Sequence, residues 1–229
     1  GDPATEYLGW RFFRVEAWSG ELHDHVHSAL CWQRADTLTV GPMLPANGPV
    51  LKSLRLPGRM AISHAWHIGA AAQLDAIRRA CAVRPLLLQI REPVLDDAAR
   101  AFAAESIRIA RSAGSLTVIN GDIDAARSLG ADGVHLKSAQ LATLDIRPPM
   151  DWVGASCHTA DDLAHAQRLG LDYAVLGPVL PTTTHPGAPV LGWEALAGLI
   201  AGCAIPVFAI GGLDGSHEAR AHACGAHGI

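Results

Sequence analysis

The stretch that decides the fold is residues 172–192, DYAVLGPVLPTTTHPGAPVLG. Its first part, residues 173–176, is a continuous apolar run that stops at Gly177-Pro178. Such a run is typical of a strand buried on both faces of a parallel sheet. The loop after it carries Thr182, Thr184 and His185, and a helix is predicted from residue 193. Loops after barrel strands hold the chemistry of barrel enzymes, so we expect a site here; a surface loop stiffened by its prolines is the alternative.

The same strand, loop and helix pattern extends from this stretch in both directions. Strands are predicted at residues 60–63, 86–91, 116–120, 134–136, 152–156, 173–176 and 207–210. Helices are predicted at residues 69–81, 96–112, 123–129, 160–169, 193–201 and 216–223. This alternation, without a hairpin signal, predicts a TIM (β/α)8 barrel. We expect an eighth strand to begin at residues 228–229, so that the barrel in this chain lacks its last strand and helix and is unclosed.

Composition excludes several classes of function. The chain of 229 residues is 49% hydrophobic and carries a net charge of −4, which does not suggest binding to nucleic-acid polymers or anionic membranes. It has no apolar run long enough to span a bilayer. Its five scattered cysteines favour reduced thiols in a cytoplasmic protein. A small phosphorylated ligand remains compatible with this composition, as does a homo-oligomer.

Residues 1–58 do not follow the repeated strand, loop and helix pattern of the rest of the chain. They predict a separate small α+β domain, with a boundary at Pro57-Gly58. Strands are expected at residues 7–18 and 29–34, and a short helix at residues 47–56. His23, His25 and His27 alternate and could share one strand face as metal ligands. We favour a polar loop, because structural zinc sites usually use four ligands at recognisable spacing.

Polar residues follow the predicted strands at the ends where barrel enzymes bind their substrates. Each has a plain reading as a capping or barrel-filling residue, but their convergence on one rim favours a site. Gly211-Gly212 before a helix offers bare backbone amides to a phosphate, with a tight turn as the alternative. The candidate substrate-binding residues are Gln89, Arg91, Asn120, His135, Ser156, Thr182, Thr184 and His185.

Residues 59–229 carry a series of motifs in this order: QIRE (89–92), VING (118–121), GADGVHL (130–136), SCHT (156–159), LGPV (176–179) with PTTT (181–184), and IPVFAIGG (205–212). In these motifs and their order the segment resembles the thiamine phosphate synthase and TenI superfamily. The resemblance implies a barrel that binds a thiazole phosphate, with the phosphate near Gly211 and Gly212. Synthases of this superfamily join the thiazole to a pyrimidine diphosphate with Mg²⁺, and TenI proteins tautomerise the thiazole.

Departures from the synthase pattern favour a TenI-like tautomerase. The two aspartates that hold Mg²⁺ in synthases are replaced by Gly121 and Gln140, so we expect no metal in the barrel. Two lysines are replaced by Pro93 and His185, which weakens the grip on a diphosphate. The resemblance makes His158 the catalytic acid/base, and imidazole suits proton transfer near neutrality.

Residues 1–58 resemble the C-terminal end of a MutT-type Nudix hydrolase, above all in LPANGPV (44–50). The resemblance makes Asn47 the reader of an oxidised guanine base, whereas a helix N-cap is its ordinary use. The glutamate-rich Nudix box that holds Mg²⁺ is absent from these residues. The chain thus resembles the later part of a Nudix–TenI fusion. The alternative function is a non-catalytic sensing or structural module of a bifunctional 8-oxo-dGTP diphosphatase.

Overall fold

The computed structural model describes residues 15, 17–21, 23, 29–35, 37–44, 47–182, 187 and 189–229. They belong to two compact units, Gly1–Val40 and Gly41–Ile229, each described here by itself. The described residues of the smaller unit form neither a helix nor a strand, only an isolated antiparallel bridge between Arg34 and Thr37. The strand predicted at residues 29–34 is therefore wrong, because no neighbouring strand supplies a ladder of hydrogen bonds. Most of the strand predicted at residues 7–18 lies outside the described residues.

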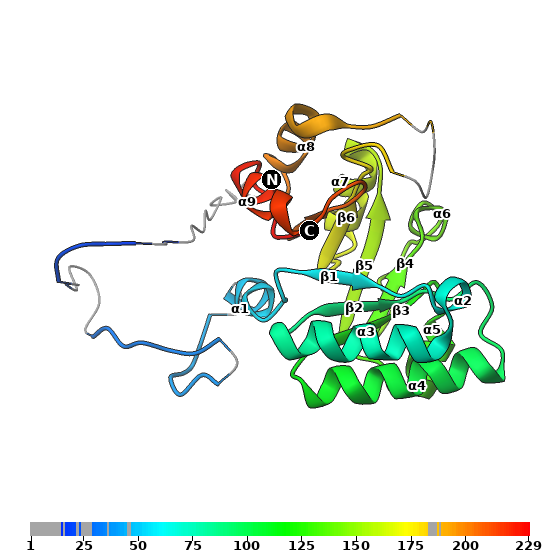
Figure 1. Ribbon diagram of the computed structural model, residues 1–229. Helices are drawn as coiled ribbons and strands as arrows, with labels where there is room; N and C mark the ends of the chain where they lie inside the picture. Colours follow the sequence, from blue (N-terminus) through cyan, green and yellow to red (C-terminus); the bar gives the residue numbers. More distant parts are fainter. Residues whose placement is uncertain are drawn as a thin grey trace, which may run out of the picture. The chain divides into compact units, whose positions relative to one another are not determined.

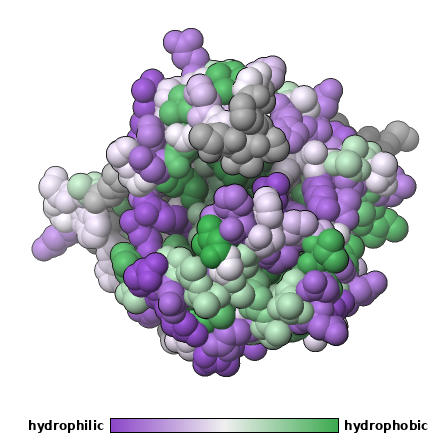
Figure 2. Space-filling view, turned by 45° about the vertical axis from the view of Figure 1, so that its right-hand side comes forward, coloured by the Kyte–Doolittle hydropathy of each residue, from purple (hydrophilic) through white to green (hydrophobic). Residues whose placement is uncertain are grey.

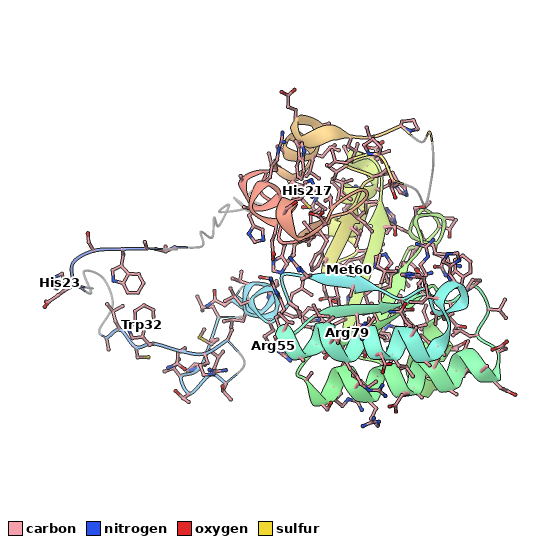
Figure 3. The ribbon with its side chains drawn as sticks, viewed as in Figure 1. His23, Trp32, Arg55, Met60, Arg79 and His217 are labelled. Atoms are coloured by element: carbon pink, nitrogen blue, oxygen red, sulfur yellow. The ribbon has the colours of Figure 1, made fainter. Side chains whose placement is uncertain are left out.

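Aromatic contact organises part of this smaller unit. The rings of Trp18 and Trp32 lie 5.6 Å apart between centroids, and Trp32 is labelled in Figure 3. Gln33 accepts hydrogen bonds through its side-chain oxygen from the amide and the hydroxyl of Thr39. These contacts are local and leave Trp32 75% exposed.

The larger unit is the predicted α/β barrel, with seven parallel strands that pair in sequence order (Figure 1). Each strand is a short apolar run, and the central strands are buried on both faces, as parallel sheets require. The strands are β1 (Met60–Ile62), β2 (Leu87–Ile90), β3 (Leu116–Asn120), β4 (Gly133–Leu136), β5 (Trp152–Cys157), β6 (Tyr173–Leu176) and β7 (Val207–Ala209).

Helices connect the strands and cover the outside of the sheet. Asp96, Asp122 and Thr159 each accept a backbone amide at the start of the helix that follows, which explains where these helices begin. Figure 1 shows α3 and α4 side by side against the sheet. The helices are α1 (Gly48–Leu54), α2 (Ala65–Ile68), α3 (Ala70–Val83), α4 (Asp97–Ser112), α5 (Ile123–Leu129), α6 (Ser138–Leu141), α7 (Ala160–Arg168), α8 (Gly192–Ile200) and α9 (Glu218–Ala223), which a 3-10 turn, η2 (Gly215–His217), precedes. No helix in the described ranges is long and apolar enough to cross a bilayer.

The last residues bring the two edges of the sheet together. The amide of Ala209 donates to the carbonyl of Gly228 at 2.9 Å, and the amide of Met60 donates to the carbonyl of Ile229 at 2.8 Å. The barrel is therefore nearly closed, whereas the sequence led us to expect an unclosed sheet. Backbone hydrogen bonds thus cover β7 from Val207 to Ala209 and the first residue of β1, Met60.

Alternation along the strands separates two apolar layers. One layer packs between the strands and the helices and includes Leu88, Ile119 and Leu176. The other fills the inside of the barrel and comprises Leu56, Leu87, Val118, Trp152, Tyr173, Val175 and Phe208, with Met60, labelled in Figure 3, packed against it. Successive strand residues point to opposite faces, so every second residue of a strand faces the inside of the barrel. These inward residues are apolar near the N-terminal ends of the strands and polar near the C-terminal ends.

The segment that contains α1 belongs to the same unit as the barrel. The ammonium of Lys52 lies 2.7 Å from a carboxylate oxygen of Asp172 and 4.8 Å from the centroid of the Trp152 ring. Leu56 is only 4% exposed and lies in the interior cluster. The packing division at residues 40/41 thus differs from the predicted boundary at 58, and the origin of residues 1–58 stays a prediction.

Candidate active site

Four predicted site residues come together inside the C-terminal half of the barrel. Gln89, Asn120, His135 and Ser156 share the inward parity of β2 to β5. The side-chain amide of Gln89 donates to Oδ1 of Asn120 at 2.8 Å. Nε2 of His135 lies 2.9 Å from Oγ of Ser156. The two contacts join neighbouring strands and form a polar layer above the apolar floor.

His135 is neutral in the folded chain. It is 1% exposed, and its Nδ1 lies 3.1 Å from the hydroxyl of Tyr173. Burial, with the positive charge of Arg91, lowers the pKa of His135 to about 3. His135 therefore contributes hydrogen bonds rather than charge at neutral pH.

His158 stands at the rim in a defined orientation. Its backbone amide donates to Oδ2 of Asp162 at 2.8 Å, the same oxygen that accepts from Thr159 in the capping box at the start of α7. Its Nδ1 lies 2.9 Å from the carbonyl oxygen of Gly177. A carbonyl only accepts, so Nδ1 carries the ring proton and the neutral imidazole keeps a lone pair on Nε2. This nitrogen is available as a base on an exposed side chain.

Gly211 and Gly212 line a second part of the rim. Both have positive φ, +96° and +67°, and a Cβ at Gly211 would lie 2.4 Å from Cβ of Pro178. Glycine is required here because the β7 loop packs directly on the β6 loop. Neither amide donates a hydrogen bond to another described residue. They line a cavity of about 390 Å³ together with Thr182.

A stacked aromatic pair lies next to Asp214, which lines this cavity. His217, labelled in Figure 3, stacks on Trp193 with ring centroids 6.0 Å apart. Its Nδ1 lies 2.9 Å from Oδ1 of Asp214, which also caps the following turn. These contacts hold the loop after β7 in place. They do not involve the amides of Gly211 and Gly212.

The thiamine monophosphate synthase family model matches residues 60–229, which is the whole barrel. The chain belongs to this family. It is 37% identical over 137 residues to the thiamine-phosphate synthase of Laribacter hongkongensis, covering 58% of this chain and 63% of that enzyme. It is 34% identical over 160 residues to the thiamine-phosphate synthase of Methanoculleus marisnigri, covering 68% of this chain and 76% of the relative.

Other relatives and structures extend the comparison. A probable thiamine biosynthetic bifunctional enzyme of Oryza sativa is 32% identical over 149 residues, which cover 62% of this chain and 27% of the relative. The chain thus spans under two thirds of the Laribacter enzyme and about a quarter of the Oryza one. The structure of thiamine phosphate pyrophosphorylase from Pyrococcus furiosus superposes with a TM-score of 0.64 at 23% identity, over 77% of this chain and 86% of that one, and supports the fold.

The two positions that the resemblance assigns to Mg²⁺ in synthases carry no carboxylate in this chain, since they are Gly121 and Gln140. Gly121 has no side chain, and its carbonyl accepts a hydrogen bond from the amide of Gln140 at 2.8 Å. The side-chain oxygen of Gln140 accepts from the backbone amide of Lys137 at 3.0 Å. Mg²⁺ is usually held by carboxylates, and both positions are neutral and hydrogen-bonded within the chain. In the described ranges no group of three His, Cys, Asp or Glu side chains is placed to hold a metal.

Two of the carboxylates that line the cavity beside Gly121, Glu92 and Asp122, accept hydrogen bonds within the chain. Both oxygens of Glu92 accept hydrogen bonds from the hydroxyl of Ser63 and the amides of Ala65 and Trp66, at 2.8–3.1 Å. Asp122 accepts the amide of Ala125 at 2.8 Å. These carboxylates position the starts of α2 and α5.

Lys137 is the residue that sequence reasoning left out of the candidate list. A Cβ at Gly121 would lie 2.8 Å from Cε of Lys137, so the lysine stem fills the space beside the glycine. Lys137 lines a cavity of about 410 Å³ with Asn120 and Glu92. Neither Lys137 nor Arg91 forms an ion pair with any residue the structure describes. The only signal in the sequence was a lysine two residues after His135.

Several predicted residues are not brought to this site. Thr184 and His185 lie outside the described residues, as do His25 and His27. Asn47 precedes α1 and makes no side-chain capping hydrogen bond. Its role as a nucleobase reader stays a prediction, and the family match begins after it, at residue 60.

Figure 2 shows that hydrophilic and apolar residues are mixed over the face turned forward from Figure 1. That face carries no single broad apolar surface.

Proposed function

We propose that the barrel binds a phosphorylated thiazole and moves a proton on it without Mg²⁺, as a thiazole tautomerase. The observation that carries the proposal is the pair Gly121 and Gln140, which are neutral and hydrogen-bonded to each other at 2.8 Å. A diphosphate leaving group in a synthase reaction needs its charge neutralised by a metal or several cations. A tautomerisation has no leaving group and needs only an acid/base.

His158 supplies the acid/base in this proposal. Its Nε2 lone pair accepts a proton from one atom of the bound thiazole, and the imidazolium returns a proton to another atom, so the reaction is balanced. The hydrogen bond from Nδ1–H to Gly177 holds the ring and stabilises the imidazolium. Such a group contributes about 10²–10⁴-fold to a rate.

The phosphate of the ligand is held by the amides of Gly211 and Gly212. Both amides are without an internal partner in the described chain, and both line the same cavity as Thr182. Backbone donors bind a phosphate without regard to side-chain identity, which fits glycine at both positions. Gln89 and Asn120 then shape the interior wall against the heterocycle.

The names of the relatives favour a second candidate, the thiamine-phosphate synthase reaction. The two candidates differ in their need for metal and for a second substrate. Purified protein should convert thiazole phosphate tautomer in the presence of EDTA. Condensation with pyrimidine diphosphate and Mg²⁺, with no EDTA-resistant tautomerisation, would instead identify a synthase.

A substitution tests the role of His158. His158→Ala should lower tautomerisation by about 10²-fold or more, while the dissociation constant for thiazole phosphate stays within about threefold. His165→Ala is the matched control, because its Nε2 contacts the carbonyl of Leu144 on the outer helix layer. Wild-type rates in His158→Ala would refute the assignment. Binding without turnover in the wild type would favour the non-catalytic alternative.

A further inference from the structure

A line of three polar side chains runs from the floor of the barrel to its mouth. The hydroxyl of Tyr173 lies 3.1 Å from Nδ1 of His135, and Nε2 of His135 lies 2.9 Å from Oγ of Ser156. Tyr173 is 0% exposed, His135 is 1% exposed, and Ser156 is half-buried at the end nearer the mouth. The line crosses three adjacent strands, β4, β5 and β6.

The surroundings of Tyr173, at the floor end of the line, determine the direction of the hydrogen bonds. Among the described residues, His135 is the one hydrogen-bond partner of the Tyr173 hydroxyl. Burial raises the pKa of Tyr173, so the phenol keeps its proton. A buried hydroxyl that donates to nothing costs about 1–3 kcal/mol, which favours donation from Tyr173 to Nδ1.

That donation determines the rest of the line. When Nδ1 accepts, the neutral imidazole carries its proton on Nε2. Nε2–H then donates to Oγ of Ser156, so the serine hydrogen cannot point back to His135. Ser156 therefore presents a donor to whatever lies above it. In the opposite tautomer, with the proton on Nδ1, the hydroxyl of Ser156 would donate to Nε2 of His135. Ser156 could then only accept a hydrogen bond from a ligand.

The sequence makes room for this arrangement at one glycine. A Cβ at Gly154 would lie 2.0 Å from Cζ of Tyr173, so any other residue there would displace the phenol. The Tyr173 ring stacks with His135 at a centroid distance of 5.7 Å and meets the edge of Phe208 at 5.8 Å. These contacts hold the hydroxyl under Nδ1.

We propose that Tyr173 is a positioning residue that acts through His135 to fix Ser156 as a hydrogen-bond donor. The site thereby selects a ligand that presents a lone pair, an oxygen or an unprotonated ring nitrogen, toward β5. The identity of this ligand as a thiazole phosphate rests on the proposed function. The direction of the hydrogen bonds does not rest on it.

Nitrogen-15 NMR of histidine-labelled protein tests the direction. In the wild type at pH 7, His135 should be the tautomer with its proton on Nε2, assigned by the signal missing from His135→Gln. A proton on Nδ1 would overturn the proposal, and this measurement needs no variant of Tyr173. Tyr173→Phe removes the donor, so the His135 signal should shift toward the other tautomer or a mixture.

Ligand binding supplies the second arm. Tyr173→Phe should weaken thiazole phosphate binding by about tenfold and leave binding of inorganic phosphate unchanged, because the phosphate site lies at Gly211 and Gly212. Ser106→Ala is the matched control, since it removes a buried hydroxyl in α4 that has no partner in the described chain. An unchanged tautomer in Tyr173→Phe with unchanged affinity for both probes would overturn the positioning role. Failure of the wild type to bind thiazole phosphate would refute the proposed function, and the NMR result would still decide the direction of the line.

Discussion

The buried His135 should make the folded protein sensitive to acid in a way that can be calculated. Its pKa is ordinarily 6.5, and burial with the charge of Arg91 lowers it to about 3 in the fold. Below pH 6.5 the unfolded chain binds a proton at this residue and the folded chain does not. Stability is therefore fully present above pH 6.5 and is lost as the pH falls toward 3.

The magnitude follows from the same values. Each pH unit in that window lowers the free energy of unfolding by about 1.4 kcal/mol. Between pH 7 and pH 5 the loss from His135 is therefore about 2 kcal/mol. Every other titrating group adds its own pH dependence, so the contribution of His135 has to be isolated by comparison with a variant.

Urea unfolding at constant ionic strength provides that comparison. His135→Gln keeps one acceptor and one donor for Tyr173 and Ser156 but cannot be protonated. The wild type should lose about 2 kcal/mol more than His135→Gln when the pH is lowered from 7 to 5. His222→Gln, which removes an exposed imidazole on α9, should keep the wild-type difference. Equal losses in the wild type and His135→Gln, within about 0.5 kcal/mol, would refute the reasoning.

Two further predictions concern stability. Gly154→Ala should lower the free energy of unfolding by about 3 kcal/mol, because the new Cβ would lie 2.0 Å from the Tyr173 ring; thermal unfolding checks it, and a loss below about 1 kcal/mol would contradict it. Asp172→Asn should cost about 2 kcal/mol, because a 10% exposed carboxylate loses its charged contacts with Lys52 and Arg147, each at 2.7 Å. A double-mutant cycle with Lys52→Met measures the coupling free energy between Lys52 and Asp172. Asp124→Asn is the control, because that side chain is 97% exposed. A coupling free energy near zero would contradict the prediction.

The strands could be predicted because each is a short apolar run with a clear end. The predicted strands at residues 116–120 and 173–176 agree with β3 and β6 to the residue. Helix α2 was not predicted, because its four residues depend on the carboxylate of Glu92, which lies in the next strand–helix unit. A contact between units leaves no periodic signal in the sequence.

The site could be predicted only in outline. Polar residues at the strand ends identified Gln89, Asn120 and Ser156, because the strand period of two places them inside the barrel. Lys137 is also a polar residue at a strand end, but it was not carried into the list of candidate residues. Tyr173 could not be recognised in this way. The position of Tyr173 depends on a glycine in the neighbouring strand, and that of Lys137 on the missing side chain at Gly121.

The helix under the barrel has a consequence for shortened versions of this protein. The family match starts at residue 60, but Leu56 fills the barrel floor, and its carbonyl lies 3.0 Å from Nε2 of His227. A version that starts at Arg59 would open the bottom of the cylinder to water and leave Asp172 without its lysine. The segment that matches the family therefore starts at residue 60, whereas the segment that completes the packing of the barrel interior includes α1.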